Sequence, residues 1–375
     1  MSANGGLDAL ETPAAIVDPA RVAANAHRAA DYARAHALAW RPHTKTHKSR
    51  AVGKIQIDSG AAGLTVATPR EAEVMADLAG DLLLAFPPIG RAKLERILDV
   101  ADDVALTVAL DSEAALDALA AAAAARGQSV GVLIEVDAGM HRVGVQSVDE
   151  ARALAARAHA LDGVRYRGIA FYPGHIRAHR TEQDHALAEL SAFVRRLLDV
   201  LGSADLEPEV VSAGSTPTFW RSHEIGGVTE VRAGTLIFND RETVASGAAS
   251  WEDCAYTILA TVVSTAVPGR AVVDAGSKAL SKEGWGIENA SFGQLLDRPE
   301  VFVVGLSEEH GILDVSGTDW RPRVGDRVRI VPNHVCVSAN LQDALWAWDG
   351  VKFEHWEQEA RGRARWLAAP GAHAE

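Results

Sequence analysis

The first two thirds of the chain alternate between short apolar runs and stretches with apolar residues every three or four positions. Eight runs are apolar enough to be strands, at residues 37–40, 63–67, 82–86, 104–110, 132–137, 166–172, 210–213 and 230–232. The stretches between them, such as 111–126 and 182–201, have the period of amphipathic helices. Eight strands joined by helical or mixed connections predict an α/β fold, a (β/α)8 barrel of the TIM type.

The pattern changes after about Arg241, where short β-rich runs are broken by glycine and proline. These runs are 255–267, 271–274, 301–306, 311–315 and 327–331. They predict a C-terminal, mostly-β domain. We therefore expect a barrel over residues 21–243 and a β-rich, metal-binding domain over residues 244–375. Residues 1–20 should add an N-terminal strand, at 14–17, to the β-rich domain.

Composition narrows the possible partners. A formal net charge of −13 argues against nucleic acid and against an anionic membrane. The longest apolar stretches, 116–125 and 256–267, are too short to span a bilayer. The first 13 residues have no basic residue and no apolar run, so we expect no secretory signal. Cys254 and Cys336 form no disulfide framework, which predicts a cytoplasmic protein.

The first strand runs into a segment rich in cationic side chains, Arg41-Pro42-His43-Thr44-Lys45-Thr46-His47-Lys48. Pro42 disfavours a helical Arg41, so an extended chain would present Arg41, His43, Lys45 and His47 on one face. A lysine in a barrel mouth is poorly solvated, which lowers its pKa and suits Schiff-base chemistry. A solvated basic loop is the alternative, and the segment alone favours it.

Three later strand ends carry candidates for binding an anion. Arg142 can donate to an oxyanion, although a surface turn with a salt bridge is the alternative. The hydroxyls and backbone N–H groups of segment 212–218 can cradle a phosphate, although a helix N-cap at Ser215 or Thr216 is the alternative. Gly234, after the eighth strand, permits a close backbone approach.

Several short motifs together resemble one enzyme family. They are Thr12-Pro13, Arg41-Pro42-His43-x-Lys45-Thr46-His47-Lys48, Asp137-x-Gly139-x-x-Arg142-x-Gly144, Tyr172-x-Gly174-His175, Gly214-Ser215-Thr216-Pro217-Thr218 and Pro332-Asn333-His334-Val335-Cys336. The set resembles the alanine-racemase-fold (type III) pyridoxal-phosphate enzymes. Within that fold it is similar to the D-threonine aldolase and D-serine dehydratase group. The resemblance covers nearly the whole chain.

The resemblance implies that pyridoxal 5'-phosphate is held as an internal aldimine on Lys45, with Lys48 as a charged neighbour. It implies that Arg142 faces the phenolic oxygen. It also implies that Arg232 faces the pyridine nitrogen, where an arginine would keep that nitrogen unprotonated. The phosphate would be held by Gly214, Ser215, Thr216, Gly234 and Thr235.

The resemblance also implies a divalent metal on His334 and Cys336, which we expect on a strand-to-loop segment with both side chains facing one cavity. Thiolate plus imidazole suits zinc, whereas manganese or magnesium would be better served by aspartate in place of Cys336. A buried cysteine beside an incidental histidine is the alternative.

The second acid–base residue stays open between Tyr172 and His175. The alternatives are a tyrosine packed under the cofactor and a histidine hydrogen-bonded to backbone. His310 is a further candidate near the metal, and a histidine in a β-turn is its alternative.

The implied activity is a metal-assisted lyase on D-β-hydroxy-α-amino acids. An aldolase would release glycine and an aldehyde. A dehydratase acting on D-serine or D-threo-3-hydroxyaspartate would release an oxo acid and ammonia, with Lys45 taking the α-proton. A racemase would need a second acid–base residue on the opposite face, usually a tyrosine from the β domain. Tyr256 is the only tyrosine there, and its expected position within a strand counts against a racemase. A non-catalytic cofactor carrier would resemble the barrel alone, so the second domain counts against it. The resemblance further implies a homodimer in which the partner's β domain completes each site.

Overall fold

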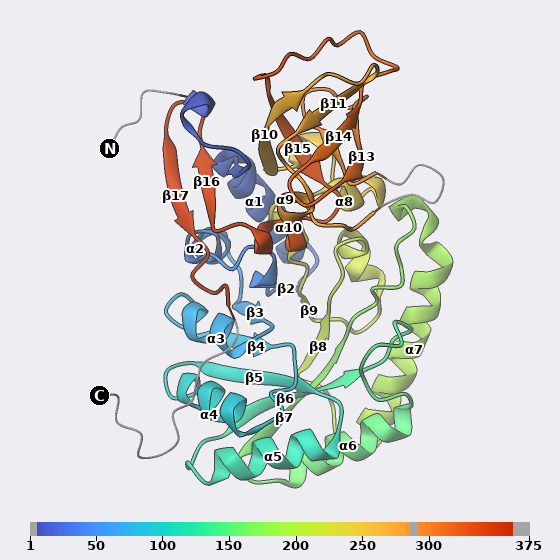
Figure 1. Ribbon diagram of the computed structural model, residues 1–375. Helices are drawn as coiled ribbons and strands as arrows, with labels where there is room; N and C mark the ends of the chain where they lie inside the picture. The colour runs from blue at the N-terminus through green and yellow to red at the C-terminus, as the bar shows by residue number, and fades with distance from the viewer. Residues whose placement is uncertain (1–5, 285–290, 363–375) are drawn as a thin grey trace, which may run out of the picture.

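The computed structural model describes residues 6–284 and 291–362, which form two sheets (Figure 1). One sheet has eight parallel strands in the order β2-β9-β8-β7-β6-β5-β4-β3. These strands are β2 (Ala39–Trp40), β3 (Leu64–Val66), β4 (Asp81–Leu84), β5 (Ala105–Leu110), β6 (Val130–Val136), β7 (Val164–Phe171), β8 (Val210–Ala213) and β9 (Glu230–Val231). Each predicted run of the first two thirds corresponds to one of them, so the predicted (β/α)8 architecture is confirmed.

The sheet curls until β2 and β3, the two ends of its strand order, meet. They are joined by an isolated parallel bridge between His43 and Thr65 in place of a regular ladder. The Thr65 N–H donates to the Pro42 carbonyl at 2.9 Å, and the Ala62 N–H donates to the Trp40 carbonyl at 2.7 Å. This seam lies beside the segment that carries Lys45, so the barrel is irregular where its chemistry is expected.

Helices connect most of the parallel strands and cover the outside of the curled sheet (Figure 1). They are α2 (Arg50–Asp58), α3 (Pro69–Met75), α4 (Arg91–Val100), α5 (Glu113–Ala124), α6 (Val148–Ala160) and α7 (Asp184–Gly202), with α1 (Pro19–Ala35) before β2 and α8 (Arg241–Ala245) after β9. The start of α1 is fixed by the Asp18 carboxylate, which accepts from the N–H groups of Ala20 and Arg21 at 3.0 Å each.

The second sheet has nine strands in the order β11-β14-β13-β12-β15-β10-β1-β16-β17, and β11 also pairs with β10. The strands are β1 (Ala14–Val17), β10 (Tyr256–Ser264), β11 (Arg270–Val273), β12 (Gly293–Leu295), β13 (Phe302–Leu306), β14 (Gly311–Asp314), β15 (Arg327–Pro332), β16 (Ala344–Trp348) and β17 (Phe353–Glu357). The N-terminal strand β1 is antiparallel to β10 and parallel to β16. The predicted mostly-β architecture after the barrel is confirmed, although β12, β16 and β17 were not predicted.

Two short helices, α9 (Ser277–Leu280) and α10 (Val335–Leu341), lie between the two sheets (Figure 1). One buried apolar cluster spans both parts of the molecule, from Trp40 and Phe219 of the barrel side to Phe238, Tyr256 and Ile330. Burying a side chain such as Phe238 contributes roughly 1.5–3 kcal/mol. This shared core holds α10 against the C-terminal ends of the barrel strands. No helix within residues 6–284 and 291–362 combines the length and apolar character needed to cross a membrane.

Candidate active site at the mouth of the barrel

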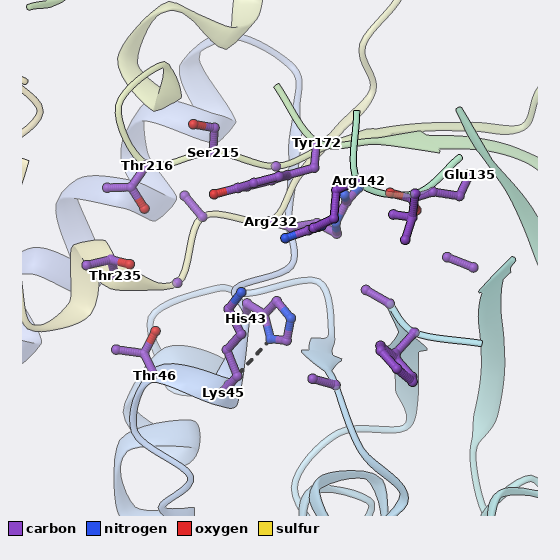
Figure 2. Close-up of a pocket in the computed structure, with 18 of the residues that line it drawn as sticks. His43, Lys45, Thr46, Glu135, Arg142, Tyr172, Ser215, Thr216, Arg232 and Thr235 are labelled. Carbon is purple, nitrogen blue, oxygen red and sulfur yellow. Dashed lines mark hydrogen bonds between the residues drawn. The ribbon is translucent and has the colours of Figure 1, made fainter. Parts of the chain in front are cut away.

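A cavity of about 400 Å3 opens at the C-terminal ends of the parallel strands (Figure 2). This is a typical size for a small-molecule site, and this end of a barrel is where active sites are built. The polar or glycine positions that line it include His43, Lys45, Thr46, Asp111, Glu135, Arg142, Tyr172, Gly214, Ser215, Thr216, Arg232, Gly234 and Thr235. The structure therefore brings together the residues that the resemblance relates to the cofactor, with the exception of Lys48.

Lys45 lies on a 3₁₀ turn over Thr44–Thr46, directly after β2 and His43. The His43 imidazole accepts from the Lys45 N–H at 3.4 Å (Figure 2). Burial, helped by the charges of Lys45 and Arg232, lowers the pKa of His43 well below its ordinary value, so this imidazole is neutral. The Lys45 side chain is exposed, so the poor solvation expected around its amine is absent from the structure.

The predicted alternation along this segment is wrong beyond His43, because the 3₁₀ turn interrupts the extended chain. Arg41 points into the barrel and pairs with Glu230, with Arg41 Nε 2.7 Å from Glu230 Oε2. His47 is buried on the other side, where its Nε2 lies 3.2 Å from Gln56 Oε1. Of the four side chains expected on one face, only His43 and Lys45 line the cavity.

Lys48 is buried away from the cavity lining and forms an ion pair with Glu71, Nζ to Oε1 3.6 Å. Its backbone is left-handed, with φ 53°, which turns the chain into α2. The alternative of a solvated basic loop is therefore wrong for most of this segment, since Arg41, His47 and Lys48 are all buried.

Hydroxyl groups gather at one end of the cavity, contributed by Thr46, Ser215, Thr216 and Thr235 (Figure 2). The Ser215 hydroxyl is buried and has no hydrogen-bond partner among the described residues. Neither Ser215 nor Thr216 is an N-cap, because the next helical turn starts at Phe219. A buried hydroxyl without a partner is costly unless a ligand satisfies it, so this end fits a phosphate group.

Gly234 brings the backbone close to this end of the cavity. A Cβ atom at this position would lie 2.3 Å from the carbonyl oxygen of His43, well inside van der Waals contact. The glycine therefore lets the chain after β9 pack directly against the segment that carries Lys45.

Arg142 reaches the cavity from the loop after β6. Its guanidinium lies 5.0 Å from the centre of the Tyr172 ring, in a cation–π arrangement. The loop is held by Asp137, which accepts from the N–H groups of Gly139 at 2.9 Å and His141 at 3.0 Å. Gly139, at φ 109°, lies in the turn of this loop, and Arg142 lines the cavity.

Tyr172 and His175, the two acid–base candidates, occupy different places. Tyr172 borders the cavity and also a second one. His175 is exposed and packs against Gly139, where an added Cβ would lie 2.8 Å from His175 Cε1. It lines neither of the two cavities.

The second cavity, of about 460 Å3, adjoins the first through Tyr172 and Ser215 and is lined by Arg177, Glu242, Glu283 and His334, among others. His334 Nδ1 lies 3.4 Å from Asp240 Oδ2 and 3.5 Å from Glu242 Oε2. Neither contact is a well-formed hydrogen bond, so this buried nitrogen has no hydrogen-bond partner among the described residues. Such an atom fits a metal ligand.

Cys336 lies on the first turn of α10, not on the strand-to-loop segment that we expected, because the chain turns helical directly after His334. The expectation that both side chains face one cavity is also wrong, because His334 lines the second cavity and Cys336 lines neither. Its sulfur lies 3.2 Å from Thr46 Oγ1 and 3.7 Å from Thr235 Oγ1. Burial would raise the pKa of Cys336, but the charge and hydrogen bond of His334 lower it. Burial likewise disfavours a charged His334, yet the Cys336 thiolate and Asp240 raise its pKa to about 12.

A divalent ion bound here would displace the proton that His334 holds, and the resulting thiolate and imidazole are a suitable donor pair for zinc. Within residues 6–284 and 291–362, no group of three or more histidine, cysteine, aspartate or glutamate side chains is arranged to hold an ion. Two protein ligands would leave coordination positions for water and substrate, as in a catalytic site.

His310, a further acid–base candidate, and Tyr256, whose place within a strand counted against a racemase, lie elsewhere. His310 is exposed on the turn between β13 and β14 and lines neither cavity. Tyr256 is fully buried in β10, and its hydroxyl lies 3.0 Å from Ser338 Oγ. Tyr256 is therefore in no position to act as a racemase's second base within this chain.

Sequence reasoning missed Glu135 and Thr46 as members of the site. Burial raises the pKa of Glu135, and the charges of Arg232 and Arg142 offset this only in part. The signal in the sequence was a lone carboxylate near the end of the apolar run that forms β6. Thr46 was quoted within the lysine motif, but its position beside Cys336 depends on the packing of α10.

Comparison with known proteins agrees with this geometry. Residues 17–242 match the family described as "Alanine racemase, N-terminal domain", and residues 255–347 match "Putative serine dehydratase domain". The chain is 31% identical over 366 residues to a D-threonine aldolase from Arthrobacter sp, covering 95% of this chain and 94% of that protein. It is 34% identical over 350 residues to a D-threo-3-hydroxyaspartate dehydratase from Delftia sp. (strain HT23), covering 88% and 92%.

The crystal structure of D-threonine aldolase from Filomicrobium marinum superposes with a TM-score of 0.87 at 30% identity, covering 96% of this chain and 99% of that one. Fold and sequence together define a pyridoxal-phosphate enzyme with the alanine racemase fold. The chain belongs to the D-threonine aldolase and D-serine dehydratase-like family of these enzymes, and it is a lyase.

Proposed function

We propose that the protein is a pyridoxal-phosphate- and divalent-metal-dependent lyase that splits D-β-hydroxy-α-amino acids into glycine and an aldehyde. The observation that carries this proposal is the 3.2 Å contact between Cys336 Sγ and Thr46 Oγ1, the residue after Lys45. It supports a metal site that adjoins the cofactor site, because the sulfur of the proposed metal ligand touches the residue next to Lys45.

In this proposal Lys45 holds the cofactor through its amine, and Arg142 and Arg232 face its phenolic oxygen and ring nitrogen. The phosphate would be held by Gly214, Ser215, Thr216, Gly234 and Thr235, of which Ser215 contributes an otherwise unsatisfied hydroxyl. When bound, pyridoxal phosphate withdraws electrons from the Cα atom of the substrate.

His334 and Cys336 would hold the metal, and their thiolate–imidazole donor set supports zinc over manganese or magnesium. When bound, such a metal lowers the pKa of the β-hydroxyl and stabilises its anion. The approximately 460 Å3 cavity beyond His334 offers room for the side chain that leaves as the aldehyde.

Two residues of this chain are candidates for taking the hydroxyl proton. Tyr172 borders both cavities. His175 follows it in the segment after β7 and lies against Gly139 of the loop after β6. Replacing each in turn, Tyr172→Phe and His175→Asn, distinguishes them, because loss of the acid–base residue lowers kcat by about 10²- to 10⁴-fold.

A dehydratase is the second candidate function, favoured by the 34% identity to the Delftia D-threo-3-hydroxyaspartate dehydratase. In that reaction Lys45 removes the proton from Cα and the β-hydroxyl leaves as hydroxide. Water then hydrolyses the released enamine, as its imine, to an oxo acid and ammonia. A racemase is disfavoured by the burial of Tyr256, and a cofactor carrier by the matched serine dehydratase domain.

We also propose a cytoplasmic homodimer. Large hydrophobic side chains, Phe86, Ile89 and Val143, are exposed in the two loops that border the first cavity, and a partner's β domain would cover them. Both cysteines are free, as a reducing compartment would keep them.

Incubation of the purified protein with D-threonine, D-serine and D-threo-3-hydroxyaspartate, each with and without a chelator, tests the activity. We expect chelator-sensitive release of glycine and acetaldehyde from D-threonine. Chelator-sensitive oxo acid and ammonia without glycine would identify the dehydratase, and appearance of the L-isomer would identify a racemase. Bound cofactor with no turnover of any substrate would contradict both lyases.

A further inference from the structure

Arg232, which lines the cavity, begins a series of buried hydrogen bonds that leads into the barrel. Its guanidinium donates from Nη1 to the Ser212 hydroxyl at 2.7 Å and from Nη2 to the Phe171 carbonyl at 3.0 Å. Burial lowers the pKa of Arg232, while the charges of Glu135 and Glu230 act in the opposite direction. The charge of an arginine that is 6% exposed is costly to bury, and such anions offset that cost.

The series of hydrogen bonds continues from Ser212 to two carboxylates and a second guanidinium. The Ser212 hydroxyl donates to Glu230 Oε1 at 2.5 Å, and Glu230 Oε2 accepts from Arg41 Nε at 2.7 Å. Arg41 Nη2 then donates to Asp81 Oδ2 at 2.9 Å. The two carboxylates, two guanidiniums and one hydroxyl run from the cavity, at the C-terminal end of β9, to the N-terminal end of β4.

Strand register produces this arrangement. Ser212 of β8 and Glu230 of β9 are direct partners across a parallel ladder, so their side chains point to the same side of the sheet. Glu230 is also the register partner of Ala39 in β2, which brings Arg41 within reach. Gly63 leaves the space, because a Cβ there would lie 2.3 Å from Arg41 Nη1.

Among the described contacts, Ser212 alone connects Arg232 to the Glu230–Arg41–Asp81 series. Arg232 has no direct hydrogen bond to Glu230 in the described structure. The hydroxyl accepts from the guanidinium and donates to the carboxylate, so both of its roles are used. Removing it leaves the Glu230–Arg41 and Arg41–Asp81 pairs intact but frees Arg232 Nη1 from its link to the buried carboxylate.

We propose that Ser212 and Glu230 are positioning residues that hold the Arg232 guanidinium toward the cofactor from below. This inference rests on the proposed function, in which Arg232 faces the cofactor. Neither residue touches the reacting atoms; each acts through Arg232, keeping a positive charge at a fixed place beside the ring.

The test compares Ser212→Ala with Thr107→Val in the purified, cofactor-loaded protein. Thr107 is a matched control, because its buried hydroxyl accepts from Arg167 Nη1 at 2.8 Å inside the same barrel but outside this chain of contacts. The readouts are the visible absorption band of the bound cofactor as a function of pH, the cofactor dissociation constant and the thermal unfolding midpoint.

We expect Ser212→Ala to weaken cofactor binding about tenfold, the scale of one hydrogen bond to a charged group. The pH midpoint of the absorption band should move upward. A positive charge nearby lowers the pKa of the protonatable group of the bound cofactor, and this effect weakens when Arg232 is held less closely. Thr107→Val should leave the cofactor dissociation constant and the pH midpoint unchanged. It should lower the thermal unfolding midpoint about as much as Ser212→Ala does.

If Ser212→Ala gave the same band, midpoint and affinity as Thr107→Val, the positioning role would be overturned while the proposed function stood. A wild-type chain that takes up no pyridoxal phosphate would overturn the proposed function and this inference together. The wild-type spectrum therefore separates the two failures.

Discussion

The Cys336 sulfur lies 3.2 Å from the Thr46 hydroxyl oxygen, although the two residues are 290 positions apart in the chain. The contact joins the first turn of α10, beside the β domain, to the turn that carries Lys45. In the proposed function it places the metal ligand against the residue next to Lys45, so the metal site and the cofactor site adjoin.

Replacing Cys336 should abolish metal binding, and replacing Cys254 should not. We expect the wild-type chain and Cys254→Ala to retain about one zinc ion per chain after gel filtration, and Cys336→Ala to retain almost none. Cys254 is the matched control because it is a buried thiol with no contact to His334 among the described contacts. Elemental analysis of the three proteins measures this, and equal zinc in all three would contradict the site.

Replacing Ser215 should weaken cofactor binding without weakening the fold. The buried Ser215 hydroxyl has no partner in the described structure, so Ser215→Ala removes no internal hydrogen bond. We expect the unfolding free energy of the cofactor-free chain to change by less than about 0.5 kcal/mol and the cofactor dissociation constant to rise about tenfold.

Ser222→Ala provides the opposite pattern, because the buried Ser222 hydroxyl donates to the Thr218 carbonyl at 3.2 Å, outside the cavity lining. It should cost about 0.5–1.5 kcal/mol of stability and leave cofactor affinity unchanged. Urea denaturation and cofactor titration of Ser215→Ala and Ser222→Ala measure the two effects. An equal loss of cofactor affinity in both variants would contradict the role of Ser215.

Gly234→Ala should disturb the Lys45 segment. The added Cβ would meet the His43 carbonyl oxygen at 2.3 Å, a backbone atom that cannot rotate away. We expect a loss of about 1–3 kcal/mol in stability and a marked loss of cofactor binding. Gly80→Ala, at an exposed glycine with no described atom within 4 Å of an added Cβ, should change neither. Similar behaviour of the two variants would argue against the close packing.

His47 should make stability depend on pH. Burial lowers the pKa of His47 to about 4, although hydrogen bonds to Gln56 and Ser49 act in the opposite direction. Because the unfolded chain binds this proton more tightly, the stabilisation is complete above about pH 6.5 and is lost as pH falls toward about 4.

In that window we expect His47 to contribute a slope of up to roughly 1.4 kcal/mol per pH unit. His47→Gln should remove that part of the slope while neighbouring histidines keep theirs. Urea midpoints at several pH values between 7 and 4 measure it, and identical slopes for both proteins would contradict a neutral, buried His47.

The strands of the barrel were predictable from the sequence because each is a buried run flanked by amphipathic segments. Gly214 and the hydroxyls of Ser215 and Thr216 were predictable as cavity residues because parallel strands bring their C-terminal ends together. The 3₁₀ turn at Thr44–Thr46 was not, since Pro42 and the strand before it favour an extended chain. Burial of Arg41 depends on Glu230 and Gly63, which are distant in sequence.

The C-terminal strands β16 and β17 were missed although the sequence carries a signal for them. Asp349-Gly350 lies between two runs with alternating large and small or polar residues, which is typical of a hairpin. The start of α10 at Val335 was missed for another reason: Asp240, far away in sequence, accepts from the Val335 N–H at 2.9 Å and stabilises the first turn.

The most direct test of the account is to identify the lysine that binds the cofactor. The purified protein is loaded with pyridoxal phosphate, reduced with borohydride, digested and mapped by mass spectrometry, with Lys45→Ala and the exposed Lys54→Ala as variants. We predict the label on Lys45 in the wild type and in Lys54→Ala, and none in Lys45→Ala. A label on any other residue, or one that survives the loss of Lys45, would contradict the proposed site.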